Sequence, residues 1–449
     1  MYKILLAFRY LLKRRITYLA VAAVGLCVFM VVVVMTVMSG LANDFKVKNH
    51  DWVGDCVIGS ESLVGFSYYE DFLQVLDKAE FVEAASPVIQ SYALLAYDPA
   101  NSNVRVEIMG IDPERYCRVT GFGRTIYYNK RNCAAVFTSP HSPNKPGCVP
   151  GIDLVIARDN LGKYYHRRTI PDASFAISSF PLTAGGALAK ADIGVVNTMD
   201  FCYSDDSHSG LAKVDESFVY LPFEQAQKLC GMDGTDKRAS KIFVRFRAGV
   251  DLETGVEKIT GLWQKFVKDN AGRTRANLFE NVTVQSWKSY RREVIAPVET
   301  EQLMMMLTFT IVAIVTVFII FVIFYMLVSH KSKDIGVLKS IGVRDNQVAR
   351  LFLLLGGLVG LCGSIIGTAG GILFLAKINQ IEAWLYRRYD FQLWDRAMYA
   401  IDEIPNQIEP ETLIVIGLAA ILVCLAGAVF PSLQAARRQP TQTLQVNQL

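Results

Sequence analysis

Four long runs without a charged residue dominate the pattern of apolar and polar positions along the chain. They cover residues 16–43, 302–329, 351–376 and 412–436. A helix needs about 20 apolar residues to cross a hydrocarbon core of about 30 Å. Each run is long enough, so the pattern predicts four transmembrane helices. No clear small-residue cleavage site ends the first run, and this favours a retained anchor over a signal peptide.

Residues 44–301, between the first two runs, have the pattern of a globular domain. Val104, Val106 and Ile108 alternate with polar residues, as in a half-buried strand, and Gly110 and Pro113 then break the pattern. Further strand-like and helix-like segments alternate along this stretch. The predicted fold class is therefore an α-helical membrane protein with four transmembrane helices and a large α+β periplasmic domain inserted between helices 1 and 2.

Basic residues in the short segments outside the runs predict which side of the membrane each segment faces. Such residues collect on the cytoplasmic side. We expect residues 1–15 to form an amphipathic interfacial helix, residues 330–350 a cytoplasmic loop and residues 437–449 a cytoplasmic tail. The inserted domain and the loop 377–411 then face outward, which in a bacterial inner membrane is the periplasm. The basic residues concerned are Lys3, Arg9, Lys13, Arg14, Arg15, Lys331, Lys333, Lys339, Arg344, Arg350, Arg437 and Arg438.

Composition agrees with this mixed architecture. Hydrophobic residues make up 52% of the chain and the mean hydropathy is positive, too apolar for an ordinary soluble protein. The net charge of +4 is small and gives little information about binding to nucleic acid. An even number of cysteines in an oxidising compartment permits three disulfides, although the pairing stays open and free thiols are possible. These cysteines of the insert are Cys56, Cys117, Cys133, Cys148, Cys202 and Cys230.

The loop 330–350 carries the most specific sequence signal. Ile335, Leu338, Ile341 and Val348 fall near helical spacing, and glycines allow the segment to bend. A solvated turn that obeys the charge bias would explain the basic residues alone. The string KDIGVLKSIGVRDNQV, however, closely resembles the coupling segment of MacB-like ABC permeases.

The resemblance extends along most of the chain and is closest to the lipoprotein-releasing LolC/LolE permeases. VMTVMSGLANDF at the end of the first run, GIDP in the insert and FPSLQAARRQPTQTLQ at the chain's end carry it. The insert departs slightly, with "LP" where the family has "PL". The resemblance implies a partner ABC ATPase that holds ATP and Mg, no cofactor in this chain, and a second permease subunit, the same or different. It also implies extraction of a lipoprotein for transfer to a carrier.

By the same resemblance, part of the loop should contact the ATPase. The residues that match the coupling segment are Lys333, Asp334, Ile335, Gly336, Leu338, Lys339 and Gly342.

Two sets of residues in the spans suggest further roles. Flexible methionines near the outer ends of the first two runs suit a cavity for acyl chains, and packing between the two helices fits the pattern equally well. A stripe of glycines in the third run lets another helix approach closely, and ordinary packing explains it better than a substrate role. The cavity residues are Met35, Met38, Leu41, Leu303, Met304, Met305 and Phe309; the glycines are Gly356, Gly360, Gly363, Gly367 and Gly371.

Motifs that would indicate an enzyme or a metal site are absent from the sequence. It contains no G-x-x-x-x-G-K-[ST], H-E-x-x-H or G-x-S-x-G, so we expect a non-catalytic subunit. The histidines are scattered, and most should be solvated. Two other functions stay open: a MacB-like efflux component, which often carries a fused ATPase, and an FtsX-like regulator of a cell-wall hydrolase, whose insert is usually shorter. A membrane-anchored enzyme is disfavoured.

Overall fold

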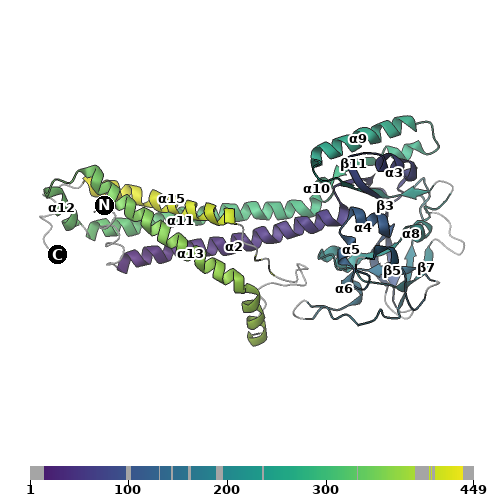
Figure 1. Ribbon diagram of the computed structural model, residues 1–449, viewed down its shortest axis with the longest axis horizontal. Helices are drawn as coiled ribbons and strands as arrows, with labels where there is room; N and C mark the ends of the chain where they lie inside the picture. Colours follow the sequence, from purple (N-terminus) through teal and green to yellow (C-terminus); the bar gives the residue numbers. More distant parts are fainter. Residues whose placement is uncertain are drawn as a thin grey trace. The chain divides into compact units, whose positions relative to one another are not determined.

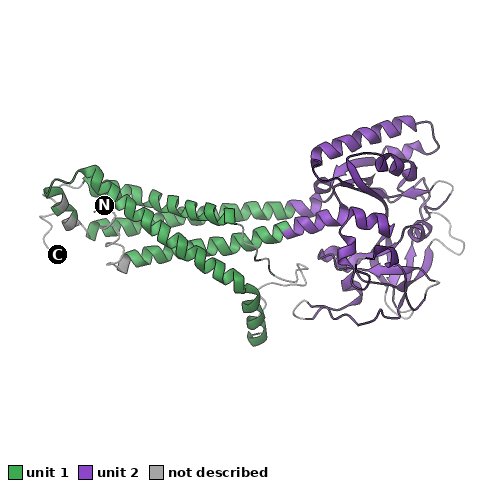
Figure 2. Ribbon diagram, in the orientation of Figure 1, with its two compact units in different colours: residues 1–43, 297–393, 403–449 green, residues 44–296, 394–402 purple. Residues whose placement is uncertain are grey.

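The computed structural model describes residues 15–97, 103–130, 132–142, 145–159, 163–188, 196–234, 237–330, 332–389, 404, 406 and 410–437. The predicted interfacial helix at 1–15, apart from its last residue, and the tail after residue 437 lie outside these ranges. The chain divides into two compact units (Figure 2). We call Met1–Asn43, Pro297–Leu393 and Glu403–Leu449 the helical unit, and Asp44–Ala296 with Trp394–Asp402 the sheet domain.

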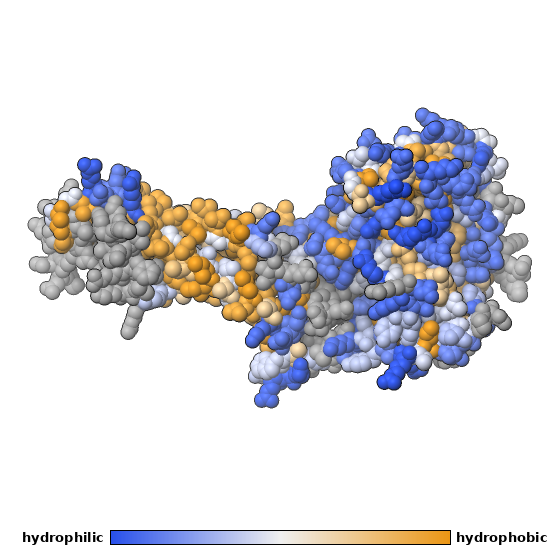
Figure 3. Space-filling view, viewed as in Figure 1, coloured by the Kyte–Doolittle hydropathy of each residue, from blue (hydrophilic) through white to orange (hydrophobic). Residues whose placement is uncertain are grey.

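Four helices are long and apolar enough to cross a membrane. They are α2 (Arg15–Val53), α11 (Arg292–His330), α13 (Asp345–Tyr389) and α15 (Pro410–Arg437), and a short α12 (Ser332–Ser340) precedes α13 (Figure 1). With the α+β domain between the first two of them, the predicted fold class is confirmed. Hydrophobic side chains gather over the middle of the helical unit, and hydrophilic ones cover most of the sheet domain on the face shown in Figure 3.

The helices extend beyond the predicted spans. α2 and α11 have 39 residues each, and at 1.5 Å per residue each is about 58 Å long, more than a hydrocarbon core requires. Residues 377–389, predicted as part of an outer loop, continue α13. No glycine or proline interrupts this stretch, so the helix has no reason to stop where the apolar run ends.

The glycines of α13 lie where other helices of the helical unit approach. A methyl group at Gly363 would lie 2.7 Å from Val24 Cγ1, and one at Gly367 would lie 2.5 Å from the carbonyl oxygen of Gly25 on α2. On the adjoining part of the face, a methyl group at Gly356 would lie 2.7 Å from Ala428 Cβ on α15. All five glycines of the stripe are buried. Close backbone approach therefore joins α2 and α15 to α13.

The main sheet of the sheet domain has nine strands in the order β11-β1-β10-β3-β4-β8-β5-β7-β6, with β3 and β6 also paired. This extra pairing closes β3, β4, β8, β5, β7 and β6 into a ring. The strands are β1 (Cys56–Ser60), β3 (Val82–Ala96), β4 (Asn103–Ile111), β5 (Gly147–Pro150), β6 (Ser174–Ser179), β7 (Asn197–Tyr203), β8 (Phe218–Pro222), β10 (Lys241–Phe246) and β11 (Val282–Ser286). β2 (Phe66–Ser67) and β9 (Arg238–Ala239) form a separate pair.

Strand β3 connects the two parts of this sheet. Its residues 82–88 pair with β10, and its residues 93–96 pair with β6. Burial follows the same division, since every residue from 84 to 89 is buried and exposed residues alternate with buried ones afterwards. A single strand of 15 residues therefore belongs to both the open part and the ring, which explains its unusual length.

Short helices cover the sheet. α3 (Tyr69–Asp77) and α9 (Leu252–Asp269) enclose one hydrophobic cluster around Phe72, Trp263 and Phe266. Two further clusters lie around Tyr116 and Tyr220, and around Phe175 and Phe201. The remaining elements are α4 (Pro113–Val119), α5 (Phe122–Thr125), α6 (Ile152–Val155), α7 (Ala212–Ser217), α8 (Phe223–Cys230), α10 (Trp287–Tyr290) and the 3₁₀ turns η1 (Cys133–Ala135) and η2 (Ala276–Phe279).

The last turns of α2 are built into the sheet domain. Trp52 is buried in its core, and its indole nitrogen donates to Tyr220 Oη at 3.0 Å. Arg291, at the other end of the domain's chain, donates through Nε to Asn49 Oδ1 at 2.8 Å and lies over the Trp52 ring, 4.7 Å from its centre. Burial lowers the pKa of Arg291. We call Asn49, Trp52 and Arg291 the clasp, because they join the first and last segments of the domain.

Fully buried carboxylates hold the loops beside the ring of strands. Asp205 accepts hydrogen bonds from the backbone N–H groups of Tyr127, Tyr128 and Asn129 at 2.7–2.9 Å. Burial raises the pKa of Asp205, although these N–H donors act in the opposite direction. Asp206 lies 2.9 Å from His166 Nε2. Satisfied buried polar groups thus help to fix these loops.

Most of the histidines are expected to be solvated, but two of them are partly buried and paired with carboxylates. His50 Nε2 lies 2.7 Å from Asp55 Oδ1. Burial acts to raise the pKa of Asp55, but hydrogen bonds from His50 and from a backbone N–H lower it overall. His166, besides its contact with Asp206, stacks on Tyr127 with 3.6 Å between ring centres. Distant sequence positions supply these partners, so spacing could not reveal them.

One of the permitted disulfides forms in the structure. Cys117 on α4 is bonded to Cys133 on η1, with Cα atoms 6.6 Å apart. Cys56, Cys148, Cys202 and Cys230 are free and buried. Burial raises the pKa of the Cys56 thiol to about 12, which keeps it protonated and inert.

We predict that Gly367→Ala weakens the contact between α13 and α2. Its methyl group would meet the Gly25 carbonyl oxygen at 2.5 Å, and such overpacking costs about 1–3 kcal/mol. Gly370→Ala is the control, since its methyl group would meet only Phe29 Cδ2, at an ordinary 3.5 Å. Heating the detergent-solubilised protein and measuring the folded fraction should give a lower midpoint for Gly367→Ala alone. Equal midpoints would contradict the packing described.

We further predict that Asn49→Ala destabilises the sheet domain. It removes the acceptor of Arg291 Nε in a partly buried hydrogen bond, and a donor left unsatisfied inside a protein costs about 1–3 kcal/mol. Arg124→Ala is the control, because the Arg124–Asp51 ion pair of 2.7 Å involves a largely exposed arginine and such pairs contribute at most about 1 kcal/mol. The midpoint of urea unfolding, followed by tryptophan fluorescence, should fall more for Asn49→Ala. The reverse order would show that the clasp is dispensable.

Candidate functional site

Helix α12 occupies the predicted coupling segment and presents apolar side chains to solvent. Val337 is 49% exposed and Ile341, just after the helix, is 77% exposed, whereas Ile335 is 2% exposed. The helix ends because Gly342 takes a left-handed conformation, with φ of +95°, in which glycine carries no steric penalty. Two exposed aliphatic side chains four residues apart form one patch on a helical surface.

Lys339 fixes α12 to its neighbours in the helical unit. Its ammonium group donates to the carbonyl oxygen of Ala436 near the end of α15, and it lies 2.7 Å from Asp345 Oδ1 at the start of α13. The lysine side chain is mostly buried. A cation near the last carbonyls of a helix is also favoured by the helix dipole. Lys339 therefore holds the coupling segment in place and leaves the exposed patch to Val337 and Ile341.

The structure places the seven predicted coupling residues in different surroundings. Ile335 and Gly336 are buried, Lys339 is bonded within the chain, and Gly342 is exposed. The side chains of Lys333, Asp334 and Leu338 lie outside the described part of the structure. Sequence reasoning placed Ile341 in the helical pattern but counted neither Val337 nor Ile341 among the residues that contact the ATPase. Gly342 could have indicated this exposure from the sequence. A glycine often ends a helix, and the apolar side chain just before it is then not covered by a further helical turn.

The predicted cavity residues lie on α2 and α11. Leu303 and Met304 are exposed, and the other five, Met35, Met38, Leu41, Met305 and Phe309, are partly buried. The two helices meet where Cys27 Sγ lies 3.0 Å from Thr316 Oγ1. Met38 and Met305 are each eleven residues from this contact, so two antiparallel helices place them at a similar height.

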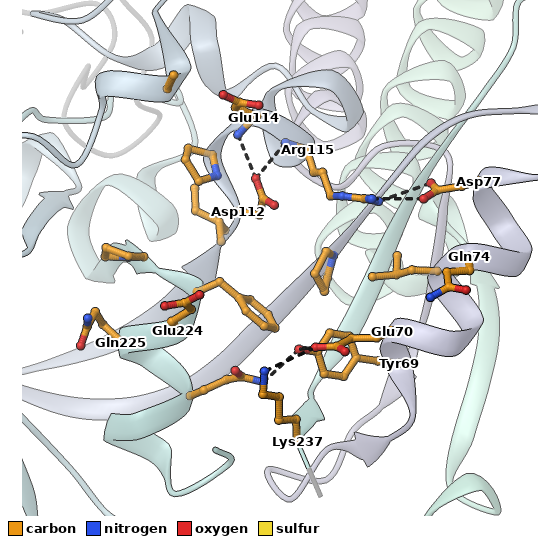
Figure 4. Close-up of a pocket in the computed structure, with 18 residues that line it drawn as sticks. Tyr69, Glu70, Gln74, Asp77, Asp112, Glu114, Arg115, Glu224, Gln225 and Lys237 are labelled. Atoms are coloured by element: carbon orange, nitrogen blue, oxygen red, sulfur yellow. Dashed lines mark hydrogen bonds and ion pairs between the residues drawn. The ribbon is translucent and has the colours of Figure 1, made fainter. Parts of the chain in front are cut away.

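A cleft of about 700 Å³ lies in the sheet domain between α3, α4 and α8 (Figure 4). We call it the acidic cleft. Its lining includes Pro87, Ile111, Pro113, Pro222 and Phe223, which are apolar. Five carboxylates and two basic side chains also line it: Glu70, Asp77, Asp112, Glu114 and Glu224, with Arg115 and Lys237.

Parallel strand pairing explains why the elements of the cleft converge. β4 and β8 are parallel neighbours, and Ile111 at the end of one is level with Pro222 at the end of the other. A helix begins directly after each strand. The Asp112 side chain caps α4 by accepting from the N–H groups of Glu114 and Arg115 at 3.1 and 3.2 Å. Two helix N-termini therefore lie at the same edge of the sheet.

Ion pairs and a buried hydrogen bond fix the other wall. Arg115 donates to both carboxylate oxygens of Asp77 on α3, at 3.1 and 3.3 Å (Figure 4). Tyr69, also on α3, accepts through its hydroxyl from Gln227 Nε2 at 3.2 Å. Burial raises the pKa of Tyr69 far above its ordinary value, so its hydroxyl stays neutral. The sequence suggested each strand end separately but gave no sign that α3 meets them.

The described residues offer no metal site. Among them, no group of three or more histidine, cysteine, aspartate or glutamate side chains is arranged to hold an ion. The acidic cleft spreads its carboxylates along several elements rather than around one point. Its chemistry suits contacts with cationic groups.

Comparisons with known proteins show similarity to membrane permeases. The family model "FtsX-like permease C-terminal" matches residues 306–440. The lipoprotein-releasing system transmembrane protein LolC of Neisseria meningitidis is 21% identical over 435 residues, which cover 96% of this chain and 94% of LolC. LolE of Haemophilus influenzae is 23% identical over 233 residues, 52% of each chain. The periplasmic region of MacB from Actinobacillus actinomycetemcomitans aligns with 55% of this chain and 95% of that structure, at 12% identity and a TM-score of 0.31.

The matched segment contains most of the membrane part of the chain. Residues 306–440 include most of α11 and all of α12, α13 and α15, while the similarity to LolC also includes the first helix and the sheet domain. The predicted resemblance to the lipoprotein-releasing ABC permeases is thus confirmed, and residues 306–440 are similar to the FtsX-like permease C-terminal family.

Proposed function

We propose that this chain is the permease subunit of an ABC complex that extracts lipoproteins from the outer leaflet of the bacterial inner membrane. The similarity to LolC over 96% of the chain supports the substrate class. The exposed Val337 and Ile341 on the segment that resembles a coupling helix support a partner ATPase. That partner would hold ATP and Mg, and this chain would do no catalysis itself.

The exposed patch on α12 is the single observation that carries this proposal. Two aliphatic side chains at this position have no role in holding the helix, because Lys339 does that. Burying them in a cleft of the ATPase would remove their apolar surface from water, at about 25 cal/mol per Å². Movement of the ATPase on ATP binding would then move α12 and, through Lys339, the ends of α13 and α15.

The energetics of extraction explain why such a complex needs ATP. Each buried CH₂ group of an acyl chain contributes about 0.8 kcal/mol to membrane anchoring. A lipoprotein with several chains cannot leave the bilayer unless an apolar surface accepts them. Leu303 and Met304 on α11 are exposed apolar side chains that suit this task, together with the methionines of α2. A second permease subunit would complete the cavity, and a carrier would receive the lipoprotein.

The name of the matched family favours one alternative. An FtsX-like permease domain would also suit a regulator of a cell-wall hydrolase. Both functions share the ATPase contact, and they differ in the partner of the outward-facing domain. Photo-crosslinking from Met38 and Met305 separates them, since lipoprotein release requires contact with a lipoprotein there and hydrolase control does not.

We predict that Ile341→Asp and Val337→Asp release the ATPase. A carboxylate at either site would be buried without a partner in the interface, so recovery of a Walker-motif ATPase with the tagged permease should fall at least about tenfold, a loss of about 1.4 kcal/mol. Asn346→Asp is the matched control, because it adds the same charge at an exposed site in the first turn of α13, where acidic residues are favoured. Equal recovery in all three variants would refute the coupling assignment.

The proposed topology gives a separate prediction. A cysteine in place of Gln264, on the exposed side of α9, should react with a membrane-impermeant maleimide added to intact spheroplasts. A cysteine in place of Ile341 should react only after the membrane is opened, because basic loops face the cytoplasm. The parent protein supplies the background labelling. Reversed accessibility would mean that the sheet domain is cytoplasmic.

A further inference from the structure

We propose that the acidic cleft binds a basic segment of a partner protein, with lysine or arginine side chains on Glu114 and Glu224 and an apolar side chain on the wall made by Pro222 and Phe223. All three helices of the cleft belong to the sheet domain. The proposal is therefore independent of the ATPase partner and of lipoprotein release, and it adds a binding site on the side of the chain that faces outward.

The charge of the cleft is opposite to that of the chain. Five carboxylates and two basic groups line it, whereas the whole chain carries a net charge of +4. Three of the carboxylates are already engaged within the fold. Asp112 caps α4, and Asp77 is paired with Arg115. Glu70 accepts from Tyr69 Oη at 3.1 Å and lies 3.8 Å from Lys237 Nζ.

Glu114 and Glu224 are differently placed. Each lies in the first turn of its helix, α4 or α8, where the helix dipole stabilises a carboxylate. No side-chain hydrogen bond or ion pair engages either carboxylate within the described ranges of the chain. These are the two acidic groups of the cleft that a cationic ligand can reach without breaking an existing contact.

The apolar wall of the same cleft is rigid. Pro222 ends β8 and Phe223 begins α8, while Pro113 begins α4 beside them. Proline fixes the backbone at both helix starts. Phe223 also packs on Tyr69, with ring centres 5.6 Å apart. A surface that is already formed loses little conformational entropy on binding, which favours a short docked segment.

A protein segment fits this combination better than a small molecule or an ion. Pockets for small molecules are mostly apolar with few polar groups, whereas this cleft carries seven charged side chains. A metal ion would need ligands that converge, and no such group exists among the described residues. An extended peptide points every second side chain to the same face, so a segment with both basic and apolar side chains on that face can present both to the cleft.

The test uses the full chain in nanodiscs of zwitterionic phosphatidylcholine and a fluorescent peptide whose one face, made by every second residue, carries both lysine and leucine, with serine at the positions between. Fluorescence anisotropy should show salt-sensitive binding. The double variant Glu114→Gln with Glu224→Gln should bind roughly three- to tenfold more weakly, the effect of losing two exposed ion pairs. Glu253→Gln with Glu257→Gln is the matched control, since both glutamates are exposed on α9 outside the cleft, and it should bind as the parent does.

Two further peptides test the chemistry of the occupant. Replacing lysine by glutamate should abolish binding, and replacing leucine by serine should weaken it, because the apolar wall then loses its contact. Binding that the cleft variant does not reduce more than the α9 variant would overturn the proposal. So would a change in oligomeric state of the cleft variant, which would instead make the cleft an interface between copies of this chain.

Discussion

The contact between Asn49, Trp52 and Arg291 holds the two ends of the sheet domain together, and the rest of the domain depends on this. A domain inserted between two helices must start and finish at the same place. Here the last turns of α2 and the residue before α11 are joined by a partly buried hydrogen bond and a cation–π contact. Trp52 then continues into the core, where its indole nitrogen meets Tyr220. The clasp therefore fixes the ends of the domain to each other and to its centre.

Strand β3 connects the clasp to the rest of the domain through strand pairing at both of its ends. One end pairs with β10, which leads through β1 to β11 and so back to Arg291, and the other end closes the ring with β6. The parallel pair β4 and β8 lies within the ring and delivers two helix starts to one edge. The acidic cleft is thus a consequence of strand pairing, with α3 supplied from the open part of the sheet.

Sequence patterns predicted those features that depend on neighbours along the chain. Four uncharged runs predicted the long helices, and the alternation at Val104, Val106 and Ile108 predicted β4. The glycine spacing predicted which face of α13 packs against other helices, and all five glycines are buried on that face. These signals are local because helix and strand periodicity are local properties.

Features that depend on distant partners were not predictable in this way. Asn49 meets Arg291 across most of the inserted domain, and Asp205 meets the N–H groups of residues 127–129. Backbone donors carry no sequence signal at all. Periodicity grouped Ile335 with Ile341, yet Ile335 is buried and Ile341 is exposed. The helix ends before Gly342, and the contacts of Lys339 fix the orientation in which α12 packs on its neighbours.

The central claim is that α12 is seated in an ATPase, and crosslinking from Ile341 measures this most directly. A photoreactive amino acid at residue 341 would be incorporated in the native cells, and the crosslinked products identified by mass spectrometry. The account predicts a crosslink to a subunit that carries the G-x-x-x-x-G-K-[ST] motif, and none when the same group replaces the partly buried Val343. Crosslinks from residue 341 only to lipid or to other parts of this chain would contradict it.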